Sequence, residues 1–156
     1  MEQVRKLHAP PGDWEVELTA GSMAAIDACL DNVLDPGTTL LVEQFTFTAA
    51  LDALRSSRAN LATVRCDAEG LVPEALEARC AELRARNVRP RALFTIPKGQ
   101  NPTGSVLRRE RYEAVYAIAC MYDFLIIEVR RNVGVGPEAC VASTSTRAAF
   151  ARAAPN

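Results

Sequence analysis

The middle of the sequence reads Pro97-Lys98-Gly99-Gln100-Asn101-Pro102-Thr103-Gly104, and the neighbouring segments are best understood from this stretch. Two prolines and two glycines in eight residues exclude a helix or a central strand, so the stretch predicts a shaped loop. An apolar run at residues 91–96 precedes the loop, and an amphipathic helical pattern at residues 107–122 follows it. The loop therefore connects a buried strand to a helix. Asn101 lies at its turn, where an Asx-type hydrogen bond is one explanation for an asparagine.

The same alternation of apolar runs and helical patterns extends on both sides of this loop. Short apolar runs predict strands at residues 14–18, 38–43, 61–66, 91–96 and 124–128. Helical spacing of apolar residues predicts helices between them, at residues 22–34, 48–57, 73–87 and 107–122. Strands that alternate with helices of about 10–15 residues form parallel sheets with right-handed crossovers. We therefore predict an α/β fold of three layers, with a parallel sheet between two layers of helices.

Four residues with possible binding roles follow or end the predicted strands. Ser22 follows the first strand, Phe47 the second and Asn101 the fourth, and Glu128 ends the fifth. Open parallel sheets bind ligands outside the carboxyl ends of their strands, so these residues map to one edge. Ser22 begins a helix, where free amide groups and the helix dipole suit a phosphate, but a plain serine N-cap is the simpler explanation. Phe47 is equally well explained as an ordinary core residue at the start of a helix.

Composition and charge narrow the class of protein. The chain has 156 residues, 49% of them hydrophobic, and a net charge of −1, so we expect one globular domain without attraction for nucleic acid or anionic membranes. It has no apolar run of about 18 residues and no apolar signal segment at its start, which predicts a cytoplasmic protein outside the membrane. The five cysteines lack metal-ligand spacing and are typical of a reducing cytosol. The single histidine, His8, argues against a histidine-based metal site or catalytic triad.

Three motifs together resemble the fold-type-I pyridoxal-phosphate aminotransferases of class I and II. Gly99-Gln100-Asn101-Pro102-Thr103-Gly104 is similar to the GxNPTG loop of that family. Tyr122-Asp123-Phe124-Leu125-Ile126-Ile127-Glu128 resembles the next strand in the subgroup that acts on aromatic amino acids, 2-aminoadipate and kynurenine. Thr19-Ala20-Gly21-Ser22 resembles the phosphate-binding turn. The resemblance implies pyridoxal 5'-phosphate as cofactor, an amino acid and a 2-oxo acid as substrates, and a homodimer.

The resemblance also implies cofactor contacts at four residues. Ser22 and Met23 would bind the phosphate, and Met23 stands where the family often has glutamine, so only its backbone N–H is available. Phe47 stands where the family usually has tyrosine; its ring can stack on the pyridine but cannot donate a hydroxyl hydrogen bond. Asn101 would contact the 3'-oxygen of the cofactor and orient its ring.

Other positions depart from the family pattern. The aspartate that pairs with the pyridinium nitrogen is replaced by Val129, and the tyrosine three residues later by Asn132. A valine cannot hold the ring nitrogen protonated by charge pairing. The two lysines, Lys6 and Lys98, do not match the family's cofactor-linking lysine, which comes far later in the chain. We therefore predict no catalytic residue and an inactive fragment of the aminotransferase large domain.

Three segments are expected. Residues 1–12 are predicted to be disordered, residues 13–129 to form part of the cofactor-binding large domain, and residues 130–156 to be a non-homologous, disordered tail. Since the resemblance stops abruptly at Val129, we hypothesise a truncated or mis-read gene product, such as a retained intron or a frameshift. A sheet that ends at the fifth strand would leave an unpaired edge. Besides the enzyme fragment, a non-catalytic cofactor-binding module and a module that pairs with full-length subunits remain open.

Overall fold

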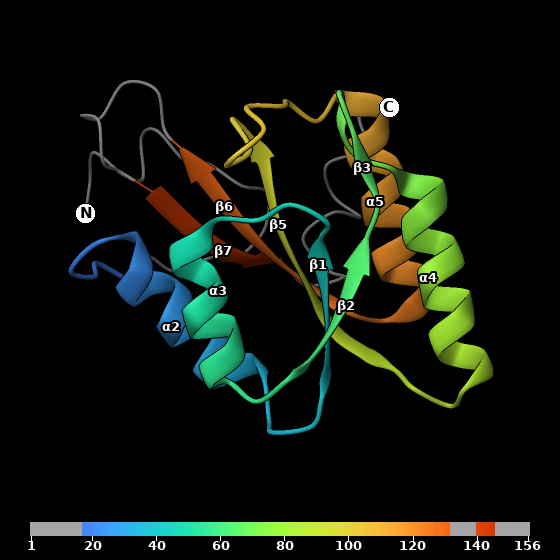
Figure 1. The fold of residues 1–156 in the computed structure, drawn as a ribbon, viewed down its shortest axis with the longest axis horizontal. Helices are drawn as coiled ribbons and strands as arrows, with labels where there is room; N and C mark the ends of the chain where they lie inside the picture. Colours follow the sequence, from blue (N-terminus) through green and yellow to red (C-terminus); the bar gives the residue numbers. More distant parts are fainter. Residues whose placement is uncertain (1–16, 132–139, 146–156) are drawn as a thin grey trace.

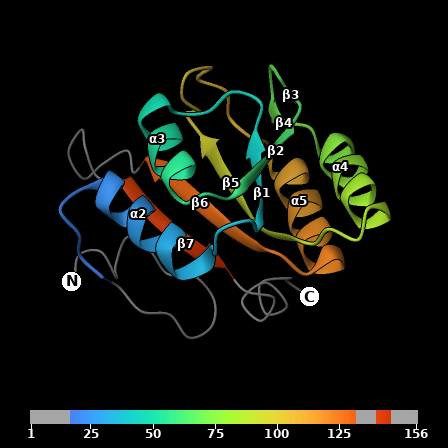
Figure 2. The ribbon, with the colours of Figure 1, turned by 60° about the horizontal axis from the view of Figure 1, so that its bottom comes forward.

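The chain folds into a five-stranded sheet with helices on both faces (Figure 1). The computed structural model describes residues 17–131 and 140–145. In the spatial order β2-β1-β5-β6-β7, the strands are β2 (Asn60–Val64), β1 (Thr39–Glu43), β5 (Pro90–Lys98), β6 (Leu125–Arg131) and β7 (Cys140–Ser145). One face is covered by α2 (Ser22–Val33) and α3 (Thr48–Ser56), the other by α4 (Pro73–Ala85) and α5 (Arg109–Tyr122) (Figure 2). Among the described helices, none is long and apolar enough to cross a membrane.

Four of the strands run parallel, which confirms the predicted three-layer α/β fold. β1 pairs in parallel with β2 and with β5, and β5 pairs in parallel with β6. Along the chain, α3 follows β1, α4 precedes β5 and α5 follows β5, so each parallel connection contains a helix. All five residues of β1 are buried, as expected for a parallel strand that is covered on both faces.

Two clusters of apolar side chains hold the three layers together. One packs α4 and α5 on the sheet, and its fully buried side chains are Leu41, Val64, Leu71, Leu76, Cys80 and Leu93. The other packs α2 and α3 on the opposite face, and its fully buried members are Ile26, Leu30, Leu40, Ala50, Leu54, Ala92, Phe94 and Ile127. Consecutive strand residues alternate between the two clusters because successive side chains of a strand point to opposite faces.

Two predicted strands differ from the observed ones. The strand predicted at residues 14–18 is not observed in the described residues. Residues 14–16 lie outside the described part, and Glu17 and Leu18 are exposed and belong to no strand. The strand predicted at residues 61–66 is divided: β2 ends at Val64, and β3 (Cys66–Asp67) instead forms an antiparallel pair with β4 (Gly70–Leu71). This hairpin turns tightly because Gly70 has a φ of 94° and the Glu69 N–H donates to Asp67 Oδ1 at 2.8 Å.

The expectation for the C-terminal part is wrong at one place. Cys140–Ser145 is not disordered but forms β7, which pairs antiparallel with β6 from Ile126↔Ser145 to Arg131↔Cys140. An unpaired strand edge presents a row of free N–H and C=O groups, so a segment that contains β-branched residues can pair with it. This pairing also explains why β6 extends to Arg131, beyond the apolar run that predicted its end at Glu128. Residues 1–12, 132–139 and 146–156 lie outside the described residues.

Candidate functional site

The loops that follow β1 and β5 lie at the same edge of the sheet, because the two strands are parallel neighbours (Figure 1). Phe47 ends the first of these loops and is the N-cap residue of α3. Asn101 lies in the second loop, two residues before Thr103. The sequence-based expectation that Phe47 and Asn101 belong to the carboxyl edge is therefore confirmed by the topology. Ser22 is the first residue of α2, the helix that shares a face of the sheet with α3.

The N-terminus of α2 has the properties of an anion site. Its N-cap, Gly21, has a φ of 111° and makes no side-chain cap hydrogen bond, and the first turn carries no acidic residue. Among the described residues, apart from the chain neighbours of Gly21, no atom lies within 4 Å of the place where a side chain at Gly21 would begin. Thr19 donates its hydroxyl to the Gly21 carbonyl at 3.0 Å, which shapes the turn without covering the amides. The first turn of α2 thus places no carboxylate of its own at the positive end of the helix dipole.

Apolar side chains connect this helix terminus to the sheet. Met23 and Phe47 are half-buried and pack against the same core cluster, which also contains Val129 of β6. Val129 is only 5% exposed, so its isopropyl group is part of the apolar layer and is not directed at solvent. The half-buried Phe47 ring contributes to the core and still presents part of its surface. Both explanations considered for Phe47 are therefore compatible with its position.

The side chain of Asn101 is exposed, and it makes no hydrogen bond with the residues that the structure describes. The Asx-type explanation for this asparagine is thus wrong. Backbone groups close the turn instead: the Gly104 N–H donates to the Gln100 carbonyl at 2.5 Å, and the Gln100 N–H donates to the Ser105 carbonyl at 3.0 Å. The Asn101 amide remains available to a ligand at the carboxyl edge.

A buried polar network lies beneath these loops, and the sequence analysis did not identify it. Glu43, the last residue of β1, is 3% exposed and accepts a hydrogen bond from Thr95 Oγ1 at 2.7 Å. Gln100 is 4% exposed and donates from Nε2 to Glu43 Oε2 at 3.1 Å. Burial raises the pKa of the Glu43 carboxyl, and the hydrogen bonds from Thr95, Gln100 and the Ile96 N–H oppose that rise. The available signal was a glutamate that ends a wholly apolar run, which is an unusual place for a charge.

A second buried carboxylate lies in the same row of the sheet. Glu128 is 3% exposed and stands in register with Thr95 on the neighbouring strand. The Tyr112 hydroxyl of α5 donates to Glu128 Oε2. Glu128 therefore faces the α5 side of the sheet, whereas its neighbour Val129 faces the α2 and α3 side. The end of its apolar run predicted the edge at which Glu128 lies, but not the face of the sheet toward which it points.

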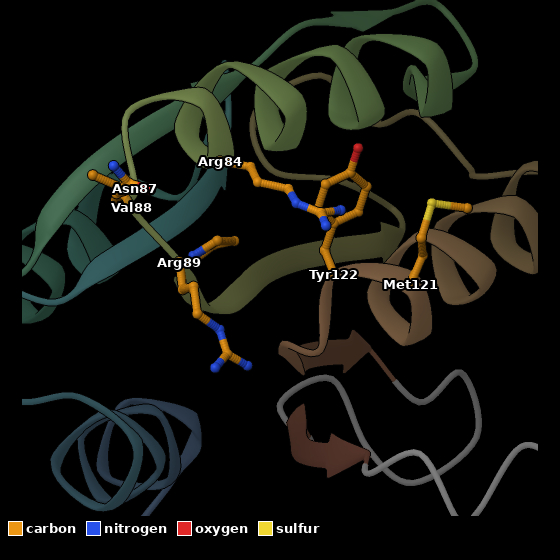
Figure 3. A pocket seen from close by; sticks show the side chains of 7 residues that line it. Arg84, Asn87, Val88, Arg89, Met121 and Tyr122 are labelled. Atoms are coloured by element: carbon orange, nitrogen blue, oxygen red, sulfur yellow. The ribbon is translucent and has the colours of Figure 1, made fainter.

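Two cavities are found at the opposite edge of the sheet. The first, of about 390 Å³, lies between the end of α4, the start of β5 and the end of α5, and Arg84, Arg89, Met121 and Tyr122 are among its lining residues (Figure 3). The second, of about 580 Å³, is lined by residues that include Thr38, Arg91 and Asp123. Both border the amino ends of the parallel strands, where open α/β sheets do not place their ligand sites. They are separate from the loops after β1 and β5.

The fold and the carboxyl edge define an α/β protein whose α2 N-terminus has no side-chain cap and no acidic residue in its first turn. Residues 13–127 match the family model of aminotransferase class I and II, and the chain belongs to this family. It is 35% identical to the aromatic amino acid aminotransferase C1773.13 of Schizosaccharomyces pombe, over 81% of this chain and 27% of that protein. It is 40% identical to aminotransferase swnA of Metarhizium robertsii, over 81% of this chain and 26% of that protein. The chain thus spans about a quarter of these relatives.

Solved structures agree with this assignment. The kynurenine aminotransferase of Pyrococcus horikoshii, solved in complex with PMP, superposes with a TM-score of 0.79 at 28% identity, over 88% of this chain and 35% of that one. The aminotransferase Aro8 of Candida albicans superposes with a TM-score of 0.74 at 41% identity, over 83% of this chain and 27% of that one. The family resemblance of the three motifs, including the relation to aromatic and kynurenine aminotransferases, is thereby confirmed.

Pyridoxal phosphate is the cofactor of this family, and the described residues fit one end of it. The free N-terminus of α2 and the Ser22 hydroxyl suit the phosphate, and the exposed amide of Asn101 suits an oxygen of the ring. Thr46 Oγ1, next to Phe47, is buried without a hydrogen-bond partner among the described residues, as a group that meets a polar ligand would be. Val129 stands at the position of the family's aspartate, but its buried isopropyl group carries no charge and cannot pair with the ring nitrogen of the cofactor.

Proposed function

We propose that this chain is the cofactor-binding part of a transaminase large domain, with Ser22, Met23, Phe47 and Asn101 as its contacts to pyridoxal phosphate. The observation that carries the proposal is the uncapped, acid-free N-terminus of α2, which shares its face of the sheet with the start of α3. A phosphorylated, aromatic ligand matches the chemistry of a helix terminus beside a half-buried phenyl ring.

Each of the four residues has a separate task in this proposal. The Ser22 hydroxyl and the Met23 backbone N–H bind the phosphate, supported by the helix dipole. Phe47 stacks on the ring and contributes about 0.5–1.5 kcal/mol beyond its burial. The Asn101 side chain donates to the 3'-oxygen and sets the rotation of the ring. When bound, the cofactor supplies an electron-withdrawing ring for amino-group transfer, and the protein supplies position and electrostatics.

For the whole protein, we infer amino-group transfer from an aromatic or related amino acid to a 2-oxo acid. The names of the relatives support this substrate class, since they include aromatic amino acid aminotransferases and an L-tyrosine:2-oxoglutarate aminotransferase of Tapinella panuoides. We also infer a cytoplasmic homodimer, from the cysteine usage of the sequence and from the family resemblance.

The second candidate function is a non-catalytic module that binds pyridoxal phosphate or pairs with a homologous subunit. The apolar Val129 at the ring-nitrogen position favours it, because a neutral ring nitrogen withdraws electrons weakly. Lys98 does not supply the missing lysine in this proposal, since it is an exposed residue at the end of β5. We therefore expect no transamination by the purified 156-residue chain, and turnover above a cofactor-only blank would contradict this expectation.

Binding of pyridoxal phosphate to the purified chain tests the proposal directly. Equilibrium dialysis should show binding of pyridoxal phosphate, weaker binding of pyridoxal, and competition by inorganic phosphate, because the helix terminus recognises the phosphate. Asn101→Ala and Phe47→Leu should weaken binding by about 5-fold each, on the order of 1 kcal/mol per lost contact. The matched control is Ser56→Ala at the far end of α3, which should bind like the parent chain. Equal affinity for pyridoxal and pyridoxal phosphate would refute the assignment.

A further inference from the structure

The buried network beneath the cofactor loops contains an amide whose hydrogen-bonding capacity is completely used. Gln100 Nε2 donates both of its protons, one to Glu43 Oε2 and one to the Phe45 carbonyl oxygen. Gln100 Oε1 accepts from the Thr103 N–H at 2.9 Å and from Thr103 Oγ1 at 2.7 Å. A side-chain amide has two donors and two acceptor lone pairs, so none is left over.

This pattern allows only one orientation of the amide. A flipped amide would place its NH₂ group against the Thr103 N–H donor, and its oxygen against the Glu43 carboxylate and the Phe45 carbonyl. Each of these contacts would bring like partial charges together inside a buried site, where unpaired polar groups are most costly. Only an amide at position 100, in this orientation, satisfies all four neighbours at once.

The network connects the two loops that carry the proposed ring contacts. Phe45, whose carbonyl oxygen receives one amide proton, lies two residues before Phe47. Gln100 itself precedes Asn101, and its oxygen holds Thr103 on the other side of the turn. The Gln100 side chain therefore connects the loop that carries Phe47 to the loop that carries Asn101.

The Glu43 carboxylate fixes this bridge to the sheet. Its Oε1 accepts from Thr95 Oγ1 at 2.7 Å, and the Ile96 N–H approaches both carboxylate oxygens at 3.4 Å. Thr95 and Ile96 belong to β5, so Glu43 connects the end of β1 to the strand that leads into the Asn101 loop. Its position at the end of a strand, 3% exposed, makes it a rigid anchor.

We propose that Glu43 and Gln100 are positioning residues of the cofactor site, which hold the Phe47 and Asn101 segments at one spacing and orientation so that both can contact the same bound pyridoxal phosphate. The pair itself does not contact the cofactor. This inference rests on the proposed function and adds the residues that preorganise its site.

The isosteric variant Gln100→Glu tests the pair through charge. It replaces the amide donor with a second carboxyl group against Glu43 and the Phe45 carbonyl, so the two carboxyl groups must share a proton to stay together. Three other titratable groups lie on the elements around the pair. The thiol pKa of Cys66 of β3 is raised by burial and by Glu43, and Glu128 of β6, which stands in register with Thr95, accepts a hydrogen bond from Tyr112 of α5. They are the same in the parent chain, so a comparison with the parent at each pH isolates the new carboxyl group.

The experiment measures pyridoxal phosphate binding to the full chain and the circular dichroism that the protein induces in the bound cofactor. At about pH 8, Gln100→Glu should bind about 10- to 100-fold more weakly than the parent, the loss expected for a buried donor turned into a repelling group. The ratio to the parent should recover toward about pH 5, as the pair takes up a proton. The induced signal per bound cofactor should fall at high pH, because the ring is no longer held in one orientation, while the far-ultraviolet spectrum of the protein stays unchanged.

Two further variants separate the loss of hydrogen bonds in the network from a general effect of added charge. Thr103→Val removes one hydrogen bond to Gln100 Oε1 from an exposed residue, and it should fold normally and lose about 3- to 10-fold in affinity. Gln44→Glu is the matched control, because it adds the same charge in the loop after β1, directly after Glu43, on an exposed side chain whose oxygen accepts from the Cys66 N–H and not from either member of the pair. It should bind within about 2-fold of the parent at each pH.

The outcomes separate this inference from the function on which it rests. If the parent chain does not bind pyridoxal phosphate at all, the proposed function fails and the positioning role fails with it. If the parent binds, but Gln100→Glu and Thr103→Val show its affinity and its induced signal at every pH, only the positioning role is refuted. If Gln44→Glu loses as much affinity as Gln100→Glu, long-range charge explains the effect and the positioning role is again refuted.

Discussion

The substitution Ser22→Asp should raise the stability of the chain and weaken its binding of pyridoxal phosphate. Helix α2 has no side-chain cap and no acidic residue in its first turn, so a carboxylate at its first position meets an uncompensated helix dipole. A negative charge at a helix N-terminus stabilises by about 0.3–1 kcal/mol. For a domain of this size, a gain in this range raises the melting temperature by about 1–4 °C.

The same carboxylate should repel the phosphate of the cofactor. Two unit charges about 5 Å apart in water interact by about 0.8 kcal/mol, and a phosphate dianion doubles this to about 1.7 kcal/mol. A loss of this size corresponds to about 15-fold in affinity, and partial burial of Ser22 makes it a lower bound. Stability and affinity thus change in opposite directions, which partial unfolding of the variant cannot imitate.

Thermal unfolding followed by circular dichroism, together with equilibrium dialysis, measures both effects. Ser22→Asn is the matched control, since it has the shape of aspartate without the charge, and it should remain within about 3-fold of the parent in affinity. If Ser22→Asp and Ser22→Asn bind the cofactor equally well, the phosphate does not lie at the N-terminus of α2, and the proposed phosphate site is refuted.

Three further substitutions test the core, the hairpin and the ring-nitrogen position. Phe94→Ala removes a fully buried ring from the centre of the sheet and should lower the free energy of unfolding by about 3–5 kcal/mol in urea titrations; a loss below about 1 kcal/mol would contradict the assigned packing. Arg111 holds the pKa of Asp67 at about 2, below its ordinary value of 3.8, so this carboxylate stabilises the folded state above pH 3.8 and loses its effect as the pH falls toward 2. Asp67→Asn should therefore melt at a lower temperature than the parent at neutral pH and at the same temperature near pH 2. Val129→Asp buries an unpaired carboxylate and should destabilise the free chain, whereas pyridoxal phosphate should raise its melting temperature more than that of the parent; an equal shift would place the ring nitrogen elsewhere.

Local patterns were sufficient to predict most of the fold. Apolar runs at residues 38–43 and 91–96 became β1 and β5, and the helices at residues 48–57 and 107–122 were found with small changes at their ends. These predictions succeed because a buried parallel strand and an amphipathic helix each have a characteristic apolar period. The apolar pattern at residues 61–66 did not predict that this segment divides into β2 and β3. The turn from Asp67 to Gly70 reverses the chain, and the apolar pattern itself shows no break there.

The amino-acid order alone determined the α/β class and the carboxyl edge of the sheet, because both follow from local periodicity, and it carried the three motifs on which the family resemblance rests. Only the tertiary structure decided that β7 closes the edge of β6 and that Glu43 and Gln100 form one buried network. Both depend on segments distant in the chain: Glu43 and Gln100 are 57 residues apart and meet only because β1 and β5 are neighbours. A buried carboxylate is acceptable in a strand only when its hydrogen-bond partners are in place, and those partners come from the fold.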